Sequence, residues 1–255
     1  MSLRRLLTGR MARAELLALA MILMAFPGLS AQVAQGSGAD PLEIDGVIDE
    51  PFYQRVPPIT EFVQIVPEVD GEPSELTEVW IGFDDDNVYV SAKVWDSAGP
   101  DGWIANEMRR DSRQLTSNDH FGVFLDTFYD RRNGVAFSGN AIGGFSDLQI
   151  TNEGNINRDW NPIWETRSAL FDGGWSIEMA IPFKSLSYRP GREQVWGIRM
   201  RRTVMRRNEW IFLRALPLSV SSSRSLQVGG GKTPGASGAG PTCSTARAAH
   251  RATAR

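Results

Sequence analysis

Hydrophobic and polar residues alternate with a period of two along most of residues 43–213. The clearest pair of segments is 79–83 and 88–94, in which every second residue is aliphatic or aromatic. The acidic residues 84–87 between them are typical of a tight turn, so the two segments predict a β-hairpin. The same alternation recurs in residues 121–125, 175–181 and 196–200. Repeated strands joined by short Gly-, Asn- and Asp-rich turns predict an all-β protein built as an antiparallel β-sandwich.

The N-terminal residues have the composition of an export signal. Arginines precede an apolar run over residues 17–26, and a Pro-Gly pair and a small-residue cleavage site follow. A membrane-spanning helix needs about 20 apolar residues, which is longer than this run. We therefore expect residues 1–31 to be a signal peptide cleaved after Ala31 or Ala34, with an uncleaved anchor as the alternative, and residues 32–41 to be a linker. Such a signal predicts an exported protein, located in the periplasm, at the outer membrane or outside the cell.

The C-terminal segment, residues 214–255, differs in composition from the rest of the chain. Small residues and arginine dominate it, and from Ser219 onward it contains no aromatic residue. Such a sequence buries too little apolar surface to offset the entropy of ordering, so we expect a disordered tail. Residues 229–233 lack the spacing and the flanking strand and helix of a phosphate-binding loop. Cys243 and His250 lie in this tail and are therefore poor candidates for site residues.

The formal net charge of −3 conceals an uneven distribution of charge. Residues 32–213 contain 17 basic and 29 acidic side chains, a net charge of −12, whereas both ends of the chain are basic. Nucleic-acid binding needs concentrated positive potential, so the acidic middle argues against a nucleic-acid partner. A single cysteine excludes a disulfide scaffold and a multi-cysteine zinc site.

A set of short phrases occurs in a characteristic order between residues 42 and 212. They are IDGVIDEPF (44–52), TEV (77–79), FDDDNVYV (83–90), RRD (109–111), DHF (119–121), LDTFYDRRNG (125–134), WNPIWE (160–165), GWSIE (174–178) and IPFKSL (181–186). In this order and spacing the chain resembles the carbohydrate-binding module family 9-like domain. The similarity is to the form found at the N-terminus of large exported bacterial proteins with a C-terminal β-barrel. The resemblance implies a jelly-roll-like sandwich over residues 42–213 that binds sugars non-catalytically, in association with glycan breakdown or uptake.

The end of the chain departs from this family pattern. Proteins of this kind continue well past the position that corresponds to residues 208–210, whereas here the Gly/Ser/Ala/Arg-rich tail begins. We therefore expect a truncated or frame-shifted reading frame, or a fragment. Membrane association is expected only through the missing C-terminal β-barrel.

Tryptophans supply the flat apolar surfaces on which sugar rings stack. Trp175 and Trp196 are in phase with aliphatic neighbours and are expected in the core. Binding residues concentrate in loops, where Trp103, Trp160 and Trp164 lie. Trp160, with Asn and Asp residues nearby, is the preferred stacking residue, and for Trp164 a structural place at the start of a strand is the alternative.

Planar polar side chains bind the hydroxyl groups of sugars, and a guanidinium group can bind two vicinal hydroxyls. This chemistry makes Arg109, Arg110, Asn140 and Asp147 candidates for a saccharide-binding groove. The alternative is a structural Arg–Asp network on the polar face of the sandwich, in which each pair contributes little to stability. Both interpretations of these polar residues stay open. The sequence identifies no catalytic residue.

Calcium is the cofactor that the sequence suggests. This ion prefers several carboxylate and carbonyl oxygens, which Asp84, Asp85 and Asp86 could provide. Between two strands the same residues are first of all a turn. The resemblance supports the metal, because family 9-like modules can carry structural calcium. Zinc is disfavoured because His120 is the sole histidine before the tail.

Three functions compete at this point. The first is non-catalytic binding of a polysaccharide or oligosaccharide. The second is a fragment of a glycoside hydrolase that acts on O-glycosyl bonds in carbohydrate catabolism through paired carboxylates, although no spacing singles out such a pair. The third is a haem-binding sandwich domain of an electron-transfer protein, with His120 and one methionine as axial ligands. The candidate methionines are Met108, Met179, Met200 and Met205.

Overall fold

The fold comes from a computed structural model. It describes residues 34–35, 42–152, 154–190, 193–214, 218–221, 225–228 and 244–249. Side chains are described within residues 42–152, 154–190 and 195–214. All described residues belong to the compact unit of residues 31–255. The signal peptide predicted for residues 1–31 lies outside the described residues, as does most of the predicted linker.

The first sheet, here called the front sheet, has the strand order β1-β3-β4-β10-β9. Its strands are β1 (Ala34–Gln35), β3 (Thr77–Phe83), β4 (Asn87–Trp95), β9 (Glu165–Phe171) and β10 (Gly174–Pro182). The predicted β3–β4 hairpin forms, β9 and β10 form a second antiparallel pair, and the two pairs join where β10 lies against β4. β1 pairs with β3 in parallel.

The second sheet, the back sheet, has the order β2-β12-β11-β5-β6-β7-β8, with β15 also paired to β11. β5 to β8 follow one another as an antiparallel meander. The strands are β2 (Phe62–Val66), β5 (His120–Asp126), β6 (Gly134–Asn140), β7 (Phe145–Thr151), β8 (Asn155–Asn157), β11 (Glu193–Val204), β12 (Glu209–Leu213) and β15 (Ser244–Ala249).

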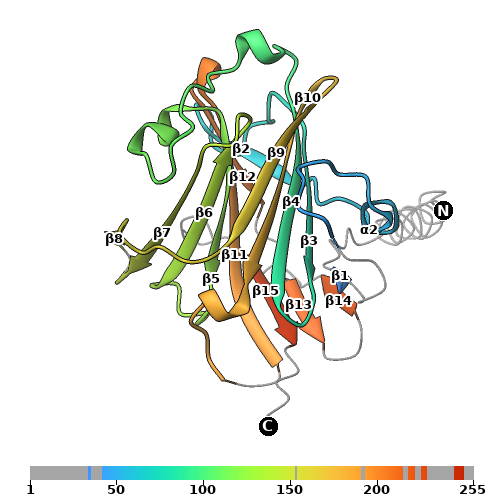
Figure 1. The fold of residues 1–255 in the computed structure, drawn as a ribbon, viewed down its shortest axis with the longest axis vertical. Helices are drawn as coiled ribbons and strands as arrows, with labels where there is room; N and C mark the ends of the chain where they lie inside the picture. The colour runs from blue at the N-terminus through green and yellow to red at the C-terminus, as the bar shows by residue number, and fades with distance from the viewer. Residues whose placement is uncertain are drawn as a thin grey trace, which may run out of the picture. The chain divides into compact units, whose positions relative to one another are not determined.

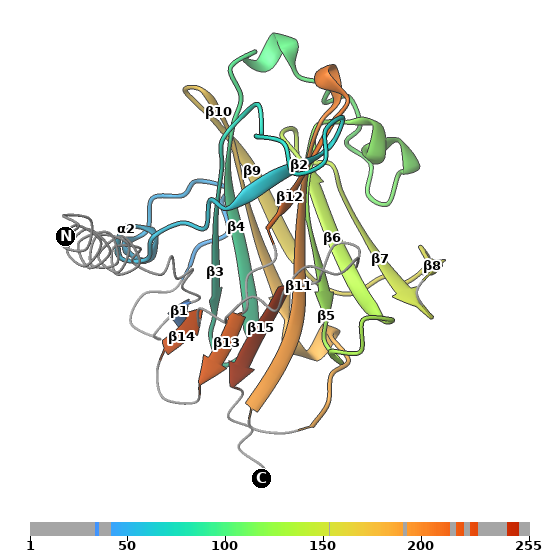
Figure 2. The same cartoon turned by 180° about the vertical axis from the view of Figure 1, so that it is seen from behind.

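The two sheets lie face to face as two layers, with β4, β9 and β10 nearer the viewer in Figure 1 and β11 and β15 nearer in Figure 2. Their facing side chains form one hydrophobic core, in which Trp175 and Trp196 are 1% and 2% exposed. Both tryptophans are therefore in the core, as predicted. The all-β antiparallel sandwich predicted from the alternation is confirmed.

Short helical turns and a small two-stranded sheet complete the fold. These elements are α2 (Pro51–Arg55), the 3-10 turns η1 (Pro100–Gly102), η2 (Arg113–Ser117), η3 (Phe183–Ser185) and η4 (Met205–Arg207), and the paired strands β13 (Leu218–Ser221) and β14 (Ser225–Val228). Within the described part of the chain, no helix has the length and apolar character needed to cross a membrane.

Strands β13, β14 and β15 fall in the segment predicted as a disordered tail. The other residues after position 214 lie outside the described residues. The disorder of this tail therefore stays a prediction.

A second, smaller hydrophobic cluster lies on the outer face of the front sheet. Phe52 and Tyr53 of α2 pack with Trp80 of β3, and the indole nitrogen of Trp80 donates to the carbonyl of Val56 at 2.8 Å. Trp80 lies among the polar positions of β3, which face away from the main core. Its contacts within this second cluster explain why its side chain is nevertheless buried. The cluster attaches the N-terminal segment, residues 42–50, and α2 to the outer face of the front sheet.

Candidate functional site

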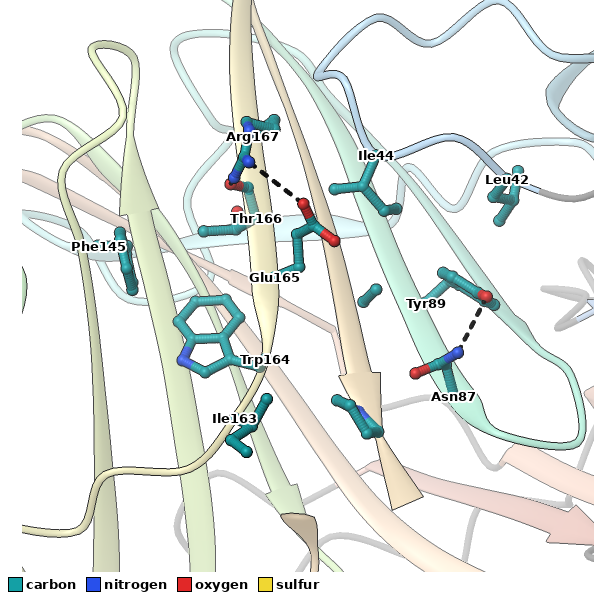
Figure 3. Close-up of a pocket in the computed structure, with 12 residues that line it drawn as sticks. Leu42, Ile44, Asn87, Tyr89, Phe145, Ile163, Trp164, Glu165, Thr166 and Arg167 are labelled. Carbon is teal, nitrogen blue, oxygen red and sulfur yellow. Dashed lines mark hydrogen bonds and ion pairs between the residues drawn. The ribbon is translucent and has the colours of Figure 1, made fainter. Parts of the chain in front are cut away.

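A cavity of about 590 Å³ opens on the outer face of the front sheet, and we call it the Trp164 groove. Strands β4, β9 and β10 form its floor, and the N-terminal segment and β7 contribute to its sides (Figure 3). Its lining combines aromatic, aliphatic and polar side chains. These are Leu42, Ile44, Asn87, Tyr89, Phe145, Ile163, Trp164, Glu165, Thr166, Arg167, Ala180 and Pro182.

The hollow follows from one row of residues across three strands. Tyr89 of β4 pairs in register with Ala180 of β10, which pairs in turn with Glu165 of β9. The methyl group of Ala180 is much smaller than its two neighbours in the row, so the sheet surface is lowest between them. Figure 3 shows Tyr89 on one side of this depression and Glu165 and Trp164 on the other.

Trp164 is held in place by contacts on its buried side. Its ring packs edge-on against Phe137 and Phe145, with ring centroids 4.9 and 5.3 Å away. Its indole nitrogen donates to Asp147 Oδ2 at 3.0 Å. The side chain is half-buried, and its remaining surface lines the groove. The groove therefore has a rigid aromatic wall, which costs little conformational entropy when a ligand binds.

Tyr89 on the opposite side is fixed through its hydroxyl group. The phenol donates to Asp84 Oδ2 at 2.7 Å and lies 3.2 Å from Asn87 Nδ2. Burial and the neighbouring Asp84 carboxylate raise the pKa of Tyr89 to about 12. The phenol is thus neutral at physiological pH, and its ring is a second oriented aromatic surface.

Polar groups beside the aromatic surfaces are accessible to solvent. Glu165 Oε1 and Arg167 Nη2 form an ion pair at 3.2 Å, and their side chains are 55% and 58% exposed. Arg167 Nη1 also donates to the carbonyl of Thr166 at 2.8 Å. An exposed pair of this kind contributes little to stability, so a ligand can replace its contacts at low cost.

Three of the residues predicted from the sequence come together directly behind the groove. Arg110 Nη2 is 2.8 Å from Asp147 Oδ2, the same oxygen that accepts the Trp164 hydrogen bond. The Arg110 guanidinium also lies 5.3 Å from the centre of the Phe145 ring. Burial raises the pKa of Asp147, although hydrogen bonds from Trp164 and Arg110 oppose the rise. Arg110 and Asp147 therefore form a structural network that orients Trp164.

The other predicted residues lie outside the lining of the Trp164 groove. Arg109 pairs with Glu107, which lowers the Glu107 pKa to about 2, and Arg109 and Arg110 line a second hollow of about 350 Å³. Asn140 is buried and donates to the carbonyl of Glu107 at 2.7 Å. Trp103 and Trp160 are half-buried and pack against the main core.

The acidic turn after β3 has the internal hydrogen bonds of a turn. Asp84 Oδ1 accepts from the backbone nitrogens of Asp86 and Asn87 at 2.8 and 2.7 Å. Among the described residues, no group of three or more His, Cys, Asp or Glu side chains is placed to hold a metal ion. Of the three calcium candidates, Asp84 is thus engaged by backbone donors and Tyr89, and calcium at Asp84, Asp85 and Asp86 stays a prediction.

Several lining residues were not among the predicted site residues. Asn87 and Tyr89 lie in the polar phase of β4, opposite the inward Val88 and Val90. An aromatic side chain in the solvent-facing phase of a strand was the available signal for Tyr89. The contribution of Ile44 could not be found in this way, because it depends on how a distant segment lies against the sheet.

No protein-family model matches the chain, and no curated protein matches it. Among solved structures, the chain is similar to a carbohydrate binding module family 9 domain from Caldicellulosiruptor kristjanssonii in complex with glucose. The two share 19% identity and a TM-score of 0.49, over 72% of this chain and 84% of that chain. The structure of the module from the same organism in complex with cellotriose has 18% identity and a TM-score of 0.47, over 72% and 83%. A candidate carbohydrate-binding protein from Bacteroides uniformis ATCC 8492 has 12% identity and a TM-score of 0.49, over 74% and 86%. The similar structures thus include domains of the family that the sequence resembles.

Proposed function

We propose that this chain binds a saccharide non-catalytically in the Trp164 groove. The observation that carries the proposal is the pairing of two oriented aromatic surfaces, Tyr89 and Trp164, with exposed planar polar groups around one open hollow. Its volume of about 590 Å³ lies in the range of small-molecule binding sites.

The chemistry of the lining suits a neutral sugar. Aromatic rings cover the apolar face of a pyranose, whereas its hydroxyl groups need hydrogen-bond donors and acceptors. Arg167 offers donors, Glu165 offers acceptors and Asn87 offers both. The lining has one acidic and one basic side chain, so it favours no net charge on the ligand.

The distribution of carboxylates supports binding over hydrolysis. Glycoside hydrolases use two carboxyl groups about 5 to 9.5 Å apart. Glu165 is the single carboxylate among the residues that line the Trp164 groove, and the second hollow has none in its lining. These two cavities therefore offer no carboxylate pair for the glycosidase alternative.

The haem alternative is disfavoured by the environment of His120. Its Nδ1 lies 2.8 Å from the carbonyl of Asn118, and its Nε2 lies 2.7 Å from Arg201 Nη2. Both ring nitrogens therefore already have protein partners. Met179 and Met200, two of the candidate second ligands, are fully buried in the hydrophobic core.

We extend the proposal to an exported protein that acts in glycan breakdown or uptake. The support is the signal-like composition of residues 1–31 and the resemblance of residues 42–213 to family 9-like modules. On this proposal the protein is located in the periplasm, at the outer membrane or outside the cell.

The test is a titration of the full chain with sugars, using calorimetry or tryptophan fluorescence. Glucose and cellotriose are the first ligands to try, followed by a panel of polysaccharides in affinity electrophoresis. Tyr89→Ala removes the aromatic surface, so we expect binding at least about tenfold weaker, equivalent to about 1.4 kcal/mol.

Tyr89→Phe is the matched control, because it keeps the ring and removes only the hydroxyl group. We expect it to bind more tightly than Tyr89→Ala, since ring stacking is retained, and less tightly than the unmodified protein, since the hydrogen bond to Asp84 that orients the ring is lost. Absence of binding to every sugar in the panel would overturn the proposal. If the Tyr89→Ala protein bound sugar as tightly as the unmodified protein, the binding site would lie outside this groove.

A further inference from the structure

One side of the Trp164 groove comes from the N-terminal segment. Leu42 and Ile44 line the groove, although they lie far from the other lining residues along the chain (Figure 3). Neither residue belongs to a strand, so no ladder of backbone hydrogen bonds fixes their position. The position of this side of the groove, which we call the segment wall, therefore depends on side-chain contacts with the front sheet. These contacts include the hydrophobic cluster around Trp80 and a hydrogen bond from Ser176 Oγ to the carbonyl of Gly46 at 2.6 Å.

The contact that involves a titratable group is made by Glu178 in the middle of β10. Its carboxylate accepts from the backbone nitrogens of Asp45 and Gly46, at 3.2 and 2.9 Å, and from the hydroxyl of Tyr53 at 2.5 Å. Glu178 is 0% exposed, because the N-terminal segment and α2 cover it. The first two donors directly follow Ile44 in the chain.

Glu178 is also next to the floor of the groove. Ser91, Glu178 and Arg167 form the next row of paired residues on the same face of the sheet, two residues along each strand from the row that contains Ala180. The backbone carbonyl of Glu178 accepts a hydrogen bond from Thr166 Oγ1, a lining residue, at 2.8 Å. Glu178 is therefore one hydrogen bond away from a residue that lines the groove.

We infer that Glu178 is a positioning residue for the segment wall, and that protonation of its carboxylate couples saccharide binding to pH. The inference rests on the proposed function of the Trp164 groove. It extends that function by making the groove depend on a buried titratable group that does not touch the ligand.

The direction of the coupling follows from burial. When the segment wall is in place, Glu178 has no contact with water, and a buried carboxylate favours its neutral form. Desolvation, assisted by the negative charge of Glu50, raises the pKa of Glu178 to about 7, whereas hydrogen bonds from Tyr53 and Gly46 oppose the rise. If the segment lifts, water reaches the carboxylate and its pKa falls toward the ordinary value of 4.5. The closed wall therefore binds the proton more tightly and is favoured at low pH.

The other charged and titratable groups around Glu178 do not reverse this direction. Burial and the Glu178 charge raise the pKa of Tyr53, so this phenol remains neutral. Arg167, opposite Glu178 on β9, is directed to Glu165 instead, and Lys93 on β4 pairs in register with Ser176. We therefore assign the change between pH 5.5 and pH 8 to the Glu178 proton.

The experiment measures the affinity of the full chain for cellotriose at about pH 5.5 and pH 8. We expect the affinity of the unmodified protein to fall about three- to tenfold at the higher pH, since one pKa unit corresponds to tenfold. Glu178→Gln is a neutral isostere that keeps an acceptor for the two backbone donors. Its affinity should therefore vary less than about twofold between the two pH values.

The matched control is Glu72→Gln, an exposed glutamate outside the groove lining. This variant should follow the pH dependence of the unmodified protein. Binding that is independent of pH in the unmodified protein would overturn the inference and leave the proposed function intact. An unchanged pH dependence in Glu178→Gln would also overturn it, whereas no binding at any pH would overturn the proposed function itself.

A second measurement needs no variant, so it stands even if Glu178→Gln does not fold. Calorimetric titrations near pH 7 in buffers with different ionisation enthalpies report the number of protons taken up on binding. We expect uptake of a fraction of one proton, because the ligand favours the closed wall. Zero uptake or proton release would overturn the inference.

Discussion

His120 is a histidine that the fold keeps neutral. It is 2% exposed, and burial together with the charge of Arg201 lowers its pKa to about 4. Its Nδ1 faces the carbonyl of Asn118, so the proton lies on Nδ1 and the lone pair of Nε2 accepts from Arg201. Protonation would place a second positive charge against the Arg201 guanidinium at a buried position.

This pKa has a consequence for stability. The unfolded chain takes up the proton near pH 6.5, whereas the folded chain does so only near pH 4. The contribution of His120 is therefore complete above pH 6.5 and is lost as the pH falls toward 4. We expect a loss on the order of 2–3 kcal/mol in the free energy of unfolding.

Urea unfolding of the unmodified protein and of His120→Gln, each at about pH 7.5 and pH 4.5, measures this loss. Glutamine does not titrate, and the carboxylates common to both proteins cancel in the comparison. The variant should lose less stability between the two pH values. An equal loss in both proteins would contradict the assignment to His120.

The tryptophans illustrate which residue positions could be predicted. Trp175 and Trp196 share the phase of aliphatic neighbours, and phase alone places them in the core. Trp160 has no such phase, and in the structure its ring packs against Phe137 at 5.8 Å. The exposure of a loop aromatic depends on which strand lies beneath it, and that information is not local in sequence.

Among the structural elements, the N-terminal segment approaches β9 closely at Gly46. Gly46 has a φ of +92°, and a Cβ atom added there would lie 2.7 Å from the backbone carbon of Ser168. Glycine is required for both reasons, since other residues avoid this conformation and there is no space for a side chain. The turn thereby delivers the Gly46 nitrogen to Glu178.

The variant Gly46→Ala tests this element. It should lower the free energy of unfolding by about 2–4 kcal/mol and weaken saccharide binding, because strain and a backbone clash add. Gly143→Ala is the matched control, since Gly143 also has a positive φ, of +84°, with open space around it. We expect the control to lose about 1 kcal/mol and to bind sugar normally. Chemical unfolding and the cellotriose titration measure both effects, and equal losses in the two variants would contradict the role of the close approach.

Strands and hairpins were predictable, whereas the neighbours of each hairpin were not. The period of two defines the β3–β4 pair, and the acidic turn joins its strands. The contact of β10 with β4 joins residues far apart in sequence, and no periodicity encodes it. The row from Tyr89 through Ala180 to Glu165 is created by that contact, so the groove could not be derived from its separate strands.

The two layers of the sandwich are joined by a buried arginine as well as by the core. Arg202 of β11 is 1% exposed and donates to the carbonyls of Leu76 and Trp95, at 2.8 and 2.5 Å. It also lies 3.3 Å from Asp96 Oδ2, which pairs with Arg206 as well. The back sheet is thereby connected to one end of the β3–β4 hairpin in the front sheet.

Arg202→Met should lower the free energy of unfolding by about 3 kcal/mol. The loss arises because the buried carbonyls and Asp96 lose donors that water cannot replace. Arg207→Met, at an exposed position nearby, should leave the free energy of unfolding nearly unchanged. Urea unfolding followed by tryptophan fluorescence checks both variants. A loss below about 1 kcal/mol in Arg202→Met would show that the core alone joins the layers.

The hydrogen bond between Gly46 and Glu178 also has a consequence during synthesis of the chain. Its two residues are 132 positions apart. Ribosomes add roughly 5–20 residues per second, so the N-terminal segment emerges on the order of ten seconds before its partner exists. Contacts of such long range also slow folding, because the entropy of closing a long loop is lost before the contact forms. A nascent chain that ends before β10 therefore has the N-terminal segment but lacks both Glu178 and the floor of the groove.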